Sequence, residues 1–504
     1  MTPSIPSAGP AEDLPDDLAD ATATALLAAY RARTVSPTEV LDAVRARMAA
    51  CEPAVHALWV VDDEGAGAAA RASADRWAEG APAGDLDGIP ITLKENIPTA
   101  GTAVPGGTAA TELVPATEDG PPAARVREAG AVLLGKTTMP DWGMASSGLS
   151  SFHDLARNPW NLDWNPGGSS AGAAAAAAAG YGPLHLGSDI GGSVRLPAGW
   201  TATVALKPSW GRVPIDPPYW GRVVGPMTRT VADAALLLDV VARPDPADRD
   251  HLSLPPTTGT FVPTDLDVAG MRVALHRDAG AGMPVDPQVD AVVVAVAEAM
   301  AAAGAEVTEI DPFLDGEQLA GLDLFWRARG WADYSALDAD ARDRVLPYIV
   351  DWVRGGADVD PVALMAATQQ QLAVGAATLA ATTAFDLVVS PVSPVATFPA
   401  TWPGPTNDVA TAMHHIGFTV PYNFSHQPAL AVQAGWTDDG RPIGVQLAGR
   451  RFDDRGVLAA GAWWERHRPD DVTPDWPTPV VRDLVRATRT TSDHHGEQPP
   501  PPPA

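Results

Sequence analysis

Short apolar runs alternate with longer helical patterns along most of the chain. Apolar runs bounded by Gly, Pro or Asp predict buried strands, whereas apolar positions spaced three and four apart predict helices. The predicted strands are 88–94, 131–134, 184–187, 272–275, 306–309, 386–390, 429–433 and 442–447. The predicted helices are about 37–50, 66–77, 122–128, 140–147, 173–179, 231–241, 289–303 and 361–381.

This alternation predicts the fold class. Strands and helices that alternate without a Pro/Ser/Gly-rich linker are typical of one large α/β domain. We expect residues 21–485 to form it, with a mixed, mostly parallel twisted sheet covered by helices on both faces. Between two late strands, 438–440 (Asp-Asp-Gly) predicts an antiparallel hairpin. Residues 1–20 and 486–504 are rich in Pro and polar residues, and we expect both to be disordered.

Composition narrows the class of partner. The 504 residues include 34 basic and 62 acidic side chains, a formal net charge of −28. Nucleic acids and anionic membranes select basic surfaces, so we expect neither as a partner. The N-terminus lacks the pattern of a signal peptide, and no stretch approaches the ~18 apolar residues of a membrane helix, so we expect a cytoplasmic protein. The single cysteine, Cys51, excludes an intramolecular disulfide and a Cys-based zinc cluster, and we expect no metal and no cofactor.

Lysine is rare in this chain. Only Lys94, Lys136 and Lys207 are present, so the other 34 − 3 = 31 basic residues are arginine. Arginine stays protonated, whereas a buried lysine can lose its proton and act as a base. All three lysines lie close in sequence to Gly/Ser-rich segments, which makes them candidates for a chemical role.

Two short motifs match known patterns outside their usual context. Residues 130–137 fit the phosphate-loop pattern, but the four residues between the glycines form the predicted strand, and Pro140 disfavours a helix directly after the Lys-Thr pair. Residues 168–172 fit the nucleophile elbow, but 158–166 before them is a Pro/Asn/Trp-rich loop rather than a strand. The sequon at 423–425 has no secretory context. Nucleotide binding and an elbow hydrolase therefore remain minor alternatives.

Two Gly/Ser segments contain the candidate chemistry. Residues 165–170 precede the alanine-rich helix, and residues 187–197 form the second segment. Glycines let the backbone approach a ligand, and successive N–H groups of such a turn can converge on the oxygen of a tetrahedral intermediate. Either segment alone could be a turn capped by serines. Together with Lys94 on a predicted strand, they favour a catalytic site.

The two segments resemble the amidase signature family. The resemblance rests on 167–172, 187–197 and 206–213 in that order, on 88–96 and 129–138 upstream, and on 427–430 and 442–447 downstream. The interval between Ser169 and Ser193 is 193 − 169 = 24 residues, the spacing of the family. The resemblance covers roughly residues 22–468, with the signature core at about 85–215. One departure is Ala171, which replaces a glycine of the usual motif.

The resemblance implies a Ser-cisSer-Lys triad. Ser193 would be the nucleophile that forms an acyl-enzyme. Ser169, with a cis peptide bond, would relay the proton to Lys94, which must be neutral to act as a base. Desolvation on an apolar strand is a physical means of lowering the pKa of that lysine from its ordinary value of about 10.4.

The resemblance also implies the groups around the triad. The backbone N–H groups of Ile190, Gly191, Gly192 and Ser193 would form an oxyanion hole. Three further residues would orient the serines and the loop, namely Ser170, Asp189 and Arg195. For the arginine, a solvated surface position fits the sequence nearly as well.

The substrate is less well defined by the sequence. Trp142 and Met144 fall where family members line the acyl pocket, and Tyr219 and Trp220 form an aromatic loop after the signature. They favour a neutral, apolar or aromatic amide, although such residues also occur as ordinary core residues. We expect an amidase that cleaves a carboxylic amide to carboxylate plus ammonia or amine (EC 3.5.1.-, with 3.5.1.4 as the expected number). A homodimer is the oligomer that we consider.

Two alternatives remain open. The amidase component of glutamyl-tRNA(Gln) amidotransferase shares the signature, but the negative charge and Leu196, where that component usually has Gln, argue against it. An alternative of another class is a non-catalytic binding protein on the same scaffold. The presence of Lys94, Ser169 and Ser193 together argues against that alternative.

Overall fold

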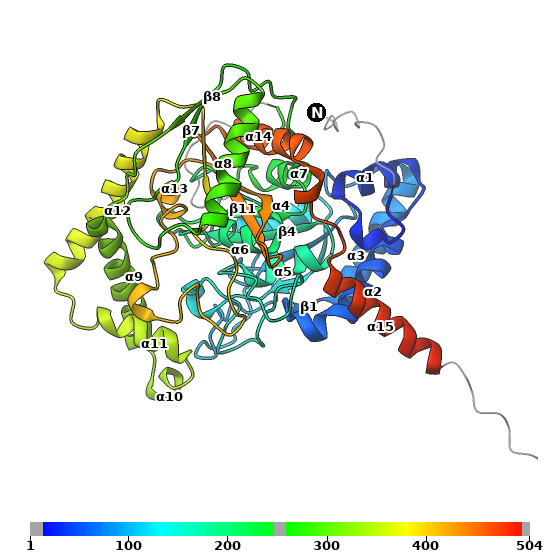
Figure 1. Ribbon diagram of the computed structural model, residues 1–504. Helices are drawn as coiled ribbons and strands as arrows, with labels where there is room; N and C mark the ends of the chain where they lie inside the picture. The colour runs from blue at the N-terminus through cyan, green and yellow to red at the C-terminus, as the bar shows by residue number, and fades with distance from the viewer. Residues whose placement is uncertain (1–13, 246–258, 496–504) are drawn as a thin grey trace, which may run out of the picture.

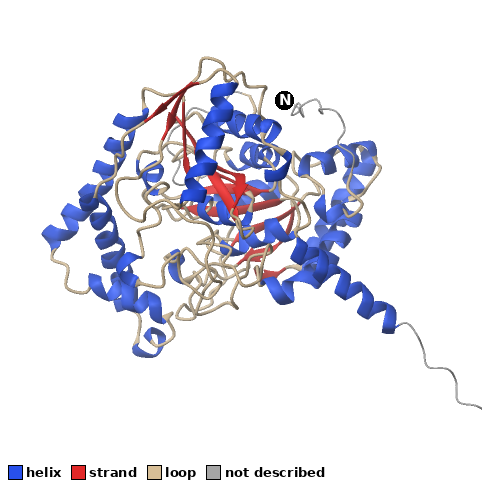
Figure 2. Cartoon of the chain, viewed as in Figure 1, coloured by secondary structure: helices blue, strands red, loops and turns tan. Residues whose placement is uncertain are grey.

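One mixed sheet runs through the middle of the molecule, with helices on both of its faces (Figures 1 and 2). The computed structural model describes residues 14–245 and 259–495. Within these ranges the sheet has 11 strands in the order β1-β3-β2-β4-β6-β5-β10-β11-β9-β7-β8. The strands are β1 (Leu58–Val61), β2 (Pro90–Lys94), β3 (Val132–Thr137), β4 (Leu184–Asp189), β5 (Val204–Lys207), β6 (Val223–Thr228), β7 (Arg272–Leu275), β8 (Glu306–Glu309), β9 (Leu387–Pro391), β10 (Ala429–Trp436) and β11 (Pro442–Gly449).

The helices pack on the sheet and on one another. In chain order they are α1 (Ala23–Ala32), α2 (Pro37–Val55), α3 (Asp63–Glu79), α4 (Pro121–Glu128), α5 (Ala171–Ala179), α6 (Arg195–Thr201), α7 (Val231–Val241), α8 (Pro287–Ala302), α9 (Gly316–Ala336), α10 (Ala339–Arg342), α11 (Pro347–Val353), α12 (Pro361–Thr382), α13 (Val420–Phe424), α14 (Asp454–His467) and α15 (Pro479–His495). Single 3-10 turns are η1 (Leu18–Asp20), η2 (Asp141–Gly143), η3 (Arg354–Gly356), η4 (Val409–Thr411) and η5 (Asp470–Val472). Among the described residues, no helix is both long and apolar enough to cross a bilayer.

The α/β fold class is confirmed, and so are most of the predicted elements. The predicted ranges of α7, β7 and β8 match the structure residue for residue, and β10 and β11 form the predicted antiparallel hairpin. Ser36 caps α2 as its capping box predicts. Its hydroxyl accepts the Glu39 N–H at 3.3 Å, and the Glu39 carboxylate accepts the Ser36 N–H at 2.8 Å.

The expectation of a mostly parallel sheet is wrong for the centre of the sheet. Parallel pairing is confined to β3-β2-β4 and β9-β7-β8. The run β4-β6-β5-β10-β11-β9 is antiparallel throughout, as is the outer pair β1-β3. A parallel pair needs a long crossover connection, whereas an antiparallel pair needs only a turn. The central strands β10 and β11 are joined by such a turn, and no helix lies between β5 and β6.

The N-terminal boundary at residue 21 is wrong, because residues 14–20 belong to the folded domain. Asp20 pairs with Arg47 at 2.7 Å and with Arg229 at 3.0 Å. Ala19, beside it, is buried against the core. These long-range ion pairs order a segment whose composition alone predicts disorder. The remaining part of that prediction, residues 1–13, lies outside the described residues.

The C-terminal boundary at residue 485 is also wrong. Helix α15 extends to His495 and packs beside α2 through Val481, Leu484 and Val485 before it projects from the body (Figure 1). The amphipathic spacing of these apolar residues sustains a helix where we expected a disordered tail. Residues 496–504, including the proline run, lie outside the described residues.

The helix predicted at 140–147 is reduced to the single turn η2. Inside it Trp142 has a positive φ of 50°, which is incompatible with a continuing α-helix.

Helix α5 determines where the Gly/Ser segments lie. Every residue of this alanine-rich helix is buried, and the helix contacts β2, β3 and β4. Its side chains are small enough to bring the backbone close to the sheet. A Cβ on Gly172 would lie 2.2 Å from the Ala57 carbonyl oxygen. This tight packing places the serines at the N-terminus of α5 against the ends of β2 and β4.

Candidate active site

The site lies at the carboxyl ends of two neighbouring parallel strands, β2 and β4. Leu93 pairs with Leu186, so Lys94 at the end of β2 and Ser188 at the end of β4 reach the same edge of the sheet. This edge is where α/β folds place their ligand sites. Helix α5 begins at the same edge and brings Ser169 and Ser170 to the lysine.

Lys94 is surrounded by hydroxyl groups. Its Nζ lies 2.8 Å from Ser169 Oγ, 3.1 Å from Ser170 Oγ and 3.0 Å from Ser188 Oγ. The lysine side chain is 0% exposed. The structure therefore brings together the lysine and both serines of the first Gly/Ser segment, and it adds Ser188, which sequence analysis did not single out.

Burial perturbs the protonation of this lysine. Desolvation lowers the pKa of Lys94 from 10.5 to about 7, against the smaller opposing effects of Asp189 and Glu95. Arg222 lowers the pKa further. A substantial fraction of the amine is thus neutral near pH 7, and a neutral amine can accept a proton.

The two serine segments are linked by their backbones. The peptide bond between Gly168 and Ser169 is cis, the geometry that the family resemblance implies. The Ser170 N–H donates to the Ser193 carbonyl at 3.1 Å. Ser169 and Ser170 are buried, whereas Ser193 is half-buried. Ser193 is therefore the more accessible of these three serines.

The loop after β4 departs from the expected oxyanion hole at one residue. The Gly192 N–H donates to Asp189 Oδ1 at 3.0 Å, so it is engaged within the loop rather than available to a substrate oxygen. Gly192 has a φ of +126°, and a Cβ there would lie 2.6 Å from Thr419 Oγ1. Gly191 differs, since its Cβ would meet only Ile416 Cδ1 at 3.5 Å.

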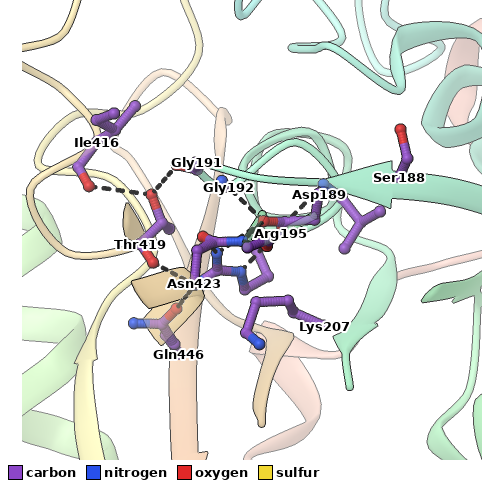
Figure 3. A network of polar contacts seen from close by, with 12 residues as sticks. Ser188, Asp189, Gly191, Gly192, Arg195, Lys207, Ile416, Thr419, Asn423 and Gln446 are labelled. Atoms are coloured by element: carbon purple, nitrogen blue, oxygen red, sulfur yellow. Dashed lines mark hydrogen bonds and ion pairs between the residues drawn. The ribbon is translucent and has the colours of Figure 1, made fainter. Parts of the chain in front are cut away.

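Asp189 and Arg195 form a buried ion pair that holds this loop (Figure 3). The Arg195 Nε donates to one carboxylate oxygen at 3.0 Å, and one of its terminal nitrogens donates to the other at 2.9 Å. The guanidinium also donates to the Thr419 carbonyl, Gln446 Oε1 and Asn423 Oδ1 at 2.7 to 2.8 Å. Arg195 is 0% exposed, which excludes the solvated position that the sequence left open.

The same ion pair changes the protonation of the aspartate. Desolvation is the largest influence and would raise the pKa of Asp189, but Arg195 and the hydrogen bond from Asn423 outweigh it and lower the pKa to about 2. Asp189 is therefore ionised at neutral pH, and it accepts the backbone N–H groups of Gly192 and Val194.

The other two lysines make backbone contacts. Lys136 Nζ contacts the Ile97 carbonyl and lies 2.6 Å from Thr99 Oγ1. Lys207 Nζ donates to the Pro208 carbonyl at 2.8 Å. For both, burial lowers the pKa from 10.5 to about 7. These contacts agree with the structural role expected for the two residues.

The predicted pocket residues fall into two separate groups. Trp142 and Met144 pack in an apolar cluster that also includes Ile190 of the loop after β4 and residues of α9 and α11. Tyr219 contacts Arg329 of α9, with the guanidinium carbon 4.8 Å from the ring centroid. Trp220 is 43% exposed and packs against Trp210 and His426.

Several contacts of the site were not found by sequence reasoning. Asn96, Ser188, Thr419, Asn423 and Gln446 all hydrogen-bond to the lysine cluster or to the ion pair. Asn423 had attracted attention only as part of a sequon, yet its side chain is fully buried. The one local signal was the position of Ser188 directly before Asp189.

Comparison with known proteins shows the family. The amidase family model (Amidase) matches residues 39–458, and the chain belongs to this family of amide-hydrolysing enzymes. An acylamidase of Rhodococcus erythropolis is 33% identical over 462 residues, which cover 89% of this chain and 95% of that protein. The amidase component of the glutamyl-tRNA(Gln) amidotransferase of Roseiflexus castenholzii is 35% identical over 480 residues, with 89% and 95% covered. The crystal structure of a bacterial aryl acylamidase has a TM-score of 0.80 at 27% identity and covers 92% of this chain and 98% of that chain.

Proposed function

We propose that this amidohydrolase cleaves amides through a Ser-cisSer-Lys triad made of Ser193, Ser169 and Lys94. The observation that carries the proposal is the fully buried Lys94 amine, 2.8 Å from Ser169 Oγ. Its lowered pKa, about 7, lets the neutral amine act as a base at physiological pH. The half-buried Ser193 is the hydroxyl that a substrate can reach.

The reaction proceeds through an acyl-enzyme. Ser193 Oγ attacks the amide carbonyl carbon while its proton passes to Ser169, and the Ser169 proton passes to Lys94. The tetrahedral intermediate then collapses, the C–N bond breaks, and the amine leaves with a proton returned from Lys94 through Ser169. Water attacks the ester carbonyl by the same relay and releases the carboxylate. The backbone N–H groups of Ile190, Gly191 and Ser193 are the proposed oxyanion donors.

The preferred substrate is a neutral amide with an apolar or aromatic acyl group, within EC 3.5.1.4 or a neighbouring class. Trp142, Met144 and Ile190 are partly exposed members of one apolar cluster, and Ile190 belongs to the loop that carries Ser193. The similarity to an acylamidase and to an aryl acylamidase supports this class.

The second candidate is the role of the amidase component of a glutamyl-tRNA(Gln) amidotransferase, favoured by the 35% identity to the Roseiflexus protein. The net charge of −28 disfavours it, because tRNA is a polyanion. A glutamine-dependent assay on glutamyl-tRNA with partner subunits tests this candidate directly.

A fluorophosphonate probe followed by peptide mapping tests the nucleophile. We expect the label on Ser193, and we expect Ser193→Ala to remove both labelling and hydrolysis across a panel of aliphatic amides, anilides, carbamates and esters. Ser170→Ala is the matched control and should leave Ser193 labelled. A label on Ser170 in the wild-type enzyme would instead support the elbow alternative.

A further inference from the structure

Lys94 has more hydroxyl neighbours than a base can use. Its Nζ lies within 2.8 to 3.1 Å of the hydroxyl oxygens of Ser169, Ser170 and Ser188. A neutral amine has two N–H donors and one lone pair, so only one of these hydroxyls can donate its hydrogen to the nitrogen. If Ser169 is the relay, the hydroxyl hydrogens of Ser170 and Ser188 must point elsewhere.

The backbone of β4 orients the Ser170 hydroxyl. This hydroxyl donates to the Ser188 carbonyl at 3.2 Å and accepts the Ser188 N–H at 3.3 Å. Its hydrogen is therefore engaged, and it presents a lone pair to Lys94.

A single side chain, Asn96, orients the Ser188 hydroxyl. The Asn96 amide nitrogen donates to Ser188 Oγ at 3.0 Å, and the Asn96 carbonyl oxygen accepts from the same hydroxyl at 3.4 Å. With Lys94 as the third partner, the hydrogen and both lone pairs of this hydroxyl are used. Asn96 follows β2 by two residues, so the strand that carries the lysine also carries the group that orients its neighbour.

We propose that Asn96 is a positioning residue that turns the Ser188 hydroxyl hydrogen away from Lys94 and so reserves the amine lone pair for Ser169. The inference rests on the proposed function, because it assumes proton transfer from Ser169 to Lys94. Without the Asn96 carbonyl oxygen, the Lys94 nitrogen becomes the acceptor in reach of the Ser188 hydroxyl. A hydrogen bond from Ser188 would then occupy the lone pair that the Ser169 proton needs.

Three charged groups already influence Lys94. Asp189 on β4 and Glu95, next to the lysine, raise the pKa of Lys94, whereas Arg222, which precedes β6, lowers it. A carboxylate at position 96 would add a negative charge one hydroxyl away, so Asn96→Asp should raise the pKa of the lysine. Asn96→Leu should lower it, because the Ser188 hydroxyl then lacks an acceptor whenever the amine is charged.

A double-mutant cycle tests the mechanism of this effect. Asn96→Leu is chosen because leucine has nearly the volume of asparagine and keeps water out of the small cavity that Asn96 and Ser188 line. We expect Asn96→Leu to lower kcat about tenfold with KM within about twofold. In the Ser188→Ala background the same substitution should have no further effect, because the competing hydroxyl is absent. Two losses that multiply would overturn the inference.

A second measurement does not depend on turnover. Because the chain has three lysines, 13Cε-lysine labelling gives three NMR signals, and Lys94→Arg identifies that of Lys94. We expect Asn96→Asp to raise and Asn96→Leu to lower the pKa of Lys94, with Lys136 unchanged. An unchanged Lys94 titration in both variants would overturn the inference. Absence of Ser193 labelling and of hydrolysis in the wild-type enzyme would instead overturn the proposed function.

Thr92→Val is the matched control. Thr92 is fully buried on β2, its Oγ1 lies 2.8 Å from His185 Nδ1, and valine keeps its shape. This variant loses one buried hydrogen bond on the same strand without touching Lys94. We expect wild-type kcat and a wild-type lysine titration. A tenfold loss of kcat in Thr92→Val would assign the effect of Asn96→Leu to the fold of β2 and would overturn the inference.

Discussion

Replacing Lys94 with arginine tests whether a neutral buried amine is the base. Burial lowers the pKa of Lys94 to about 7, so near pH 7 about half of the molecules hold the amine uncharged. A guanidinium stays protonated at any pH at which the protein is folded, and therefore cannot accept the Ser169 proton. Loss of general-base catalysis lowers kcat/KM by about 10²–10⁴-fold.

The wild-type pH profile has a sign and a shape that follow from the same pKa. Only the neutral amine is active, so kcat/KM rises as the pH rises through about 7 and then levels off. At one pH unit below that pKa about a tenth of the amine is neutral, and at two units below about a hundredth. The acid limb should therefore have a slope of one.

The assay is kcat/KM from pH 5 to pH 9 with an amide that the enzyme hydrolyses. Lys136→Met is the matched control, since Lys136 is also buried with a pKa of about 7 but contacts Ile97 and Thr99 rather than the serines. It should retain the acid limb. If Lys94→Arg keeps kcat/KM within tenfold of wild type at pH 7, or if Lys136→Met abolishes the acid limb, the assignment of Lys94 as the base is refuted.

Three further outcomes concern the loop after β4. A methyl group on Gly191 would meet its nearest atom at 3.5 Å, so Gly191→Ala should keep the wild-type Tm but reduce kcat/KM, whereas Gly192→Ala, with its Cβ 2.6 Å from Thr419 Oγ1, should lower the Tm in a thermal melt. Arg195→Met leaves a carboxylate buried without its partner and should lower the free energy of unfolding by about 3–5 kcal/mol, and a urea titration with an unchanged midpoint would contradict this. Because the pKa of Asp189 falls from 3.8 to about 2 in the folded protein, its contribution to stability is present above pH 4 and is lost as the pH falls through 2. Wild-type Tm should therefore decrease between pH 4 and pH 2, and a flat profile would count against the ion pair.

The elements that the sequence predicted well are those whose pattern is local. The apolar run of β7 and the helical period of α7 depend on residues within one or two turns of each other, and their limits match the structure. The Gly/Ser segments were recognisable for the same reason, since glycine and serine at short spacing have few structural uses. The rarity of lysine singled out Lys94 without any structure.

The partners of the site residues depend on contacts between distant parts of the chain. Arg195 meets Thr419, Asn423 and Gln446 across 224 to 251 residues, and no local pattern links them. The antiparallel centre of the sheet and the ion pairs of Asp20 were missed for the same reason. Composition and period determine which segments become strands and helices, because those preferences arise from neighbouring residues. Which strands pair, which charges are buried together, and which hydroxyl faces the lysine are decided only when distant segments pack and exclude water.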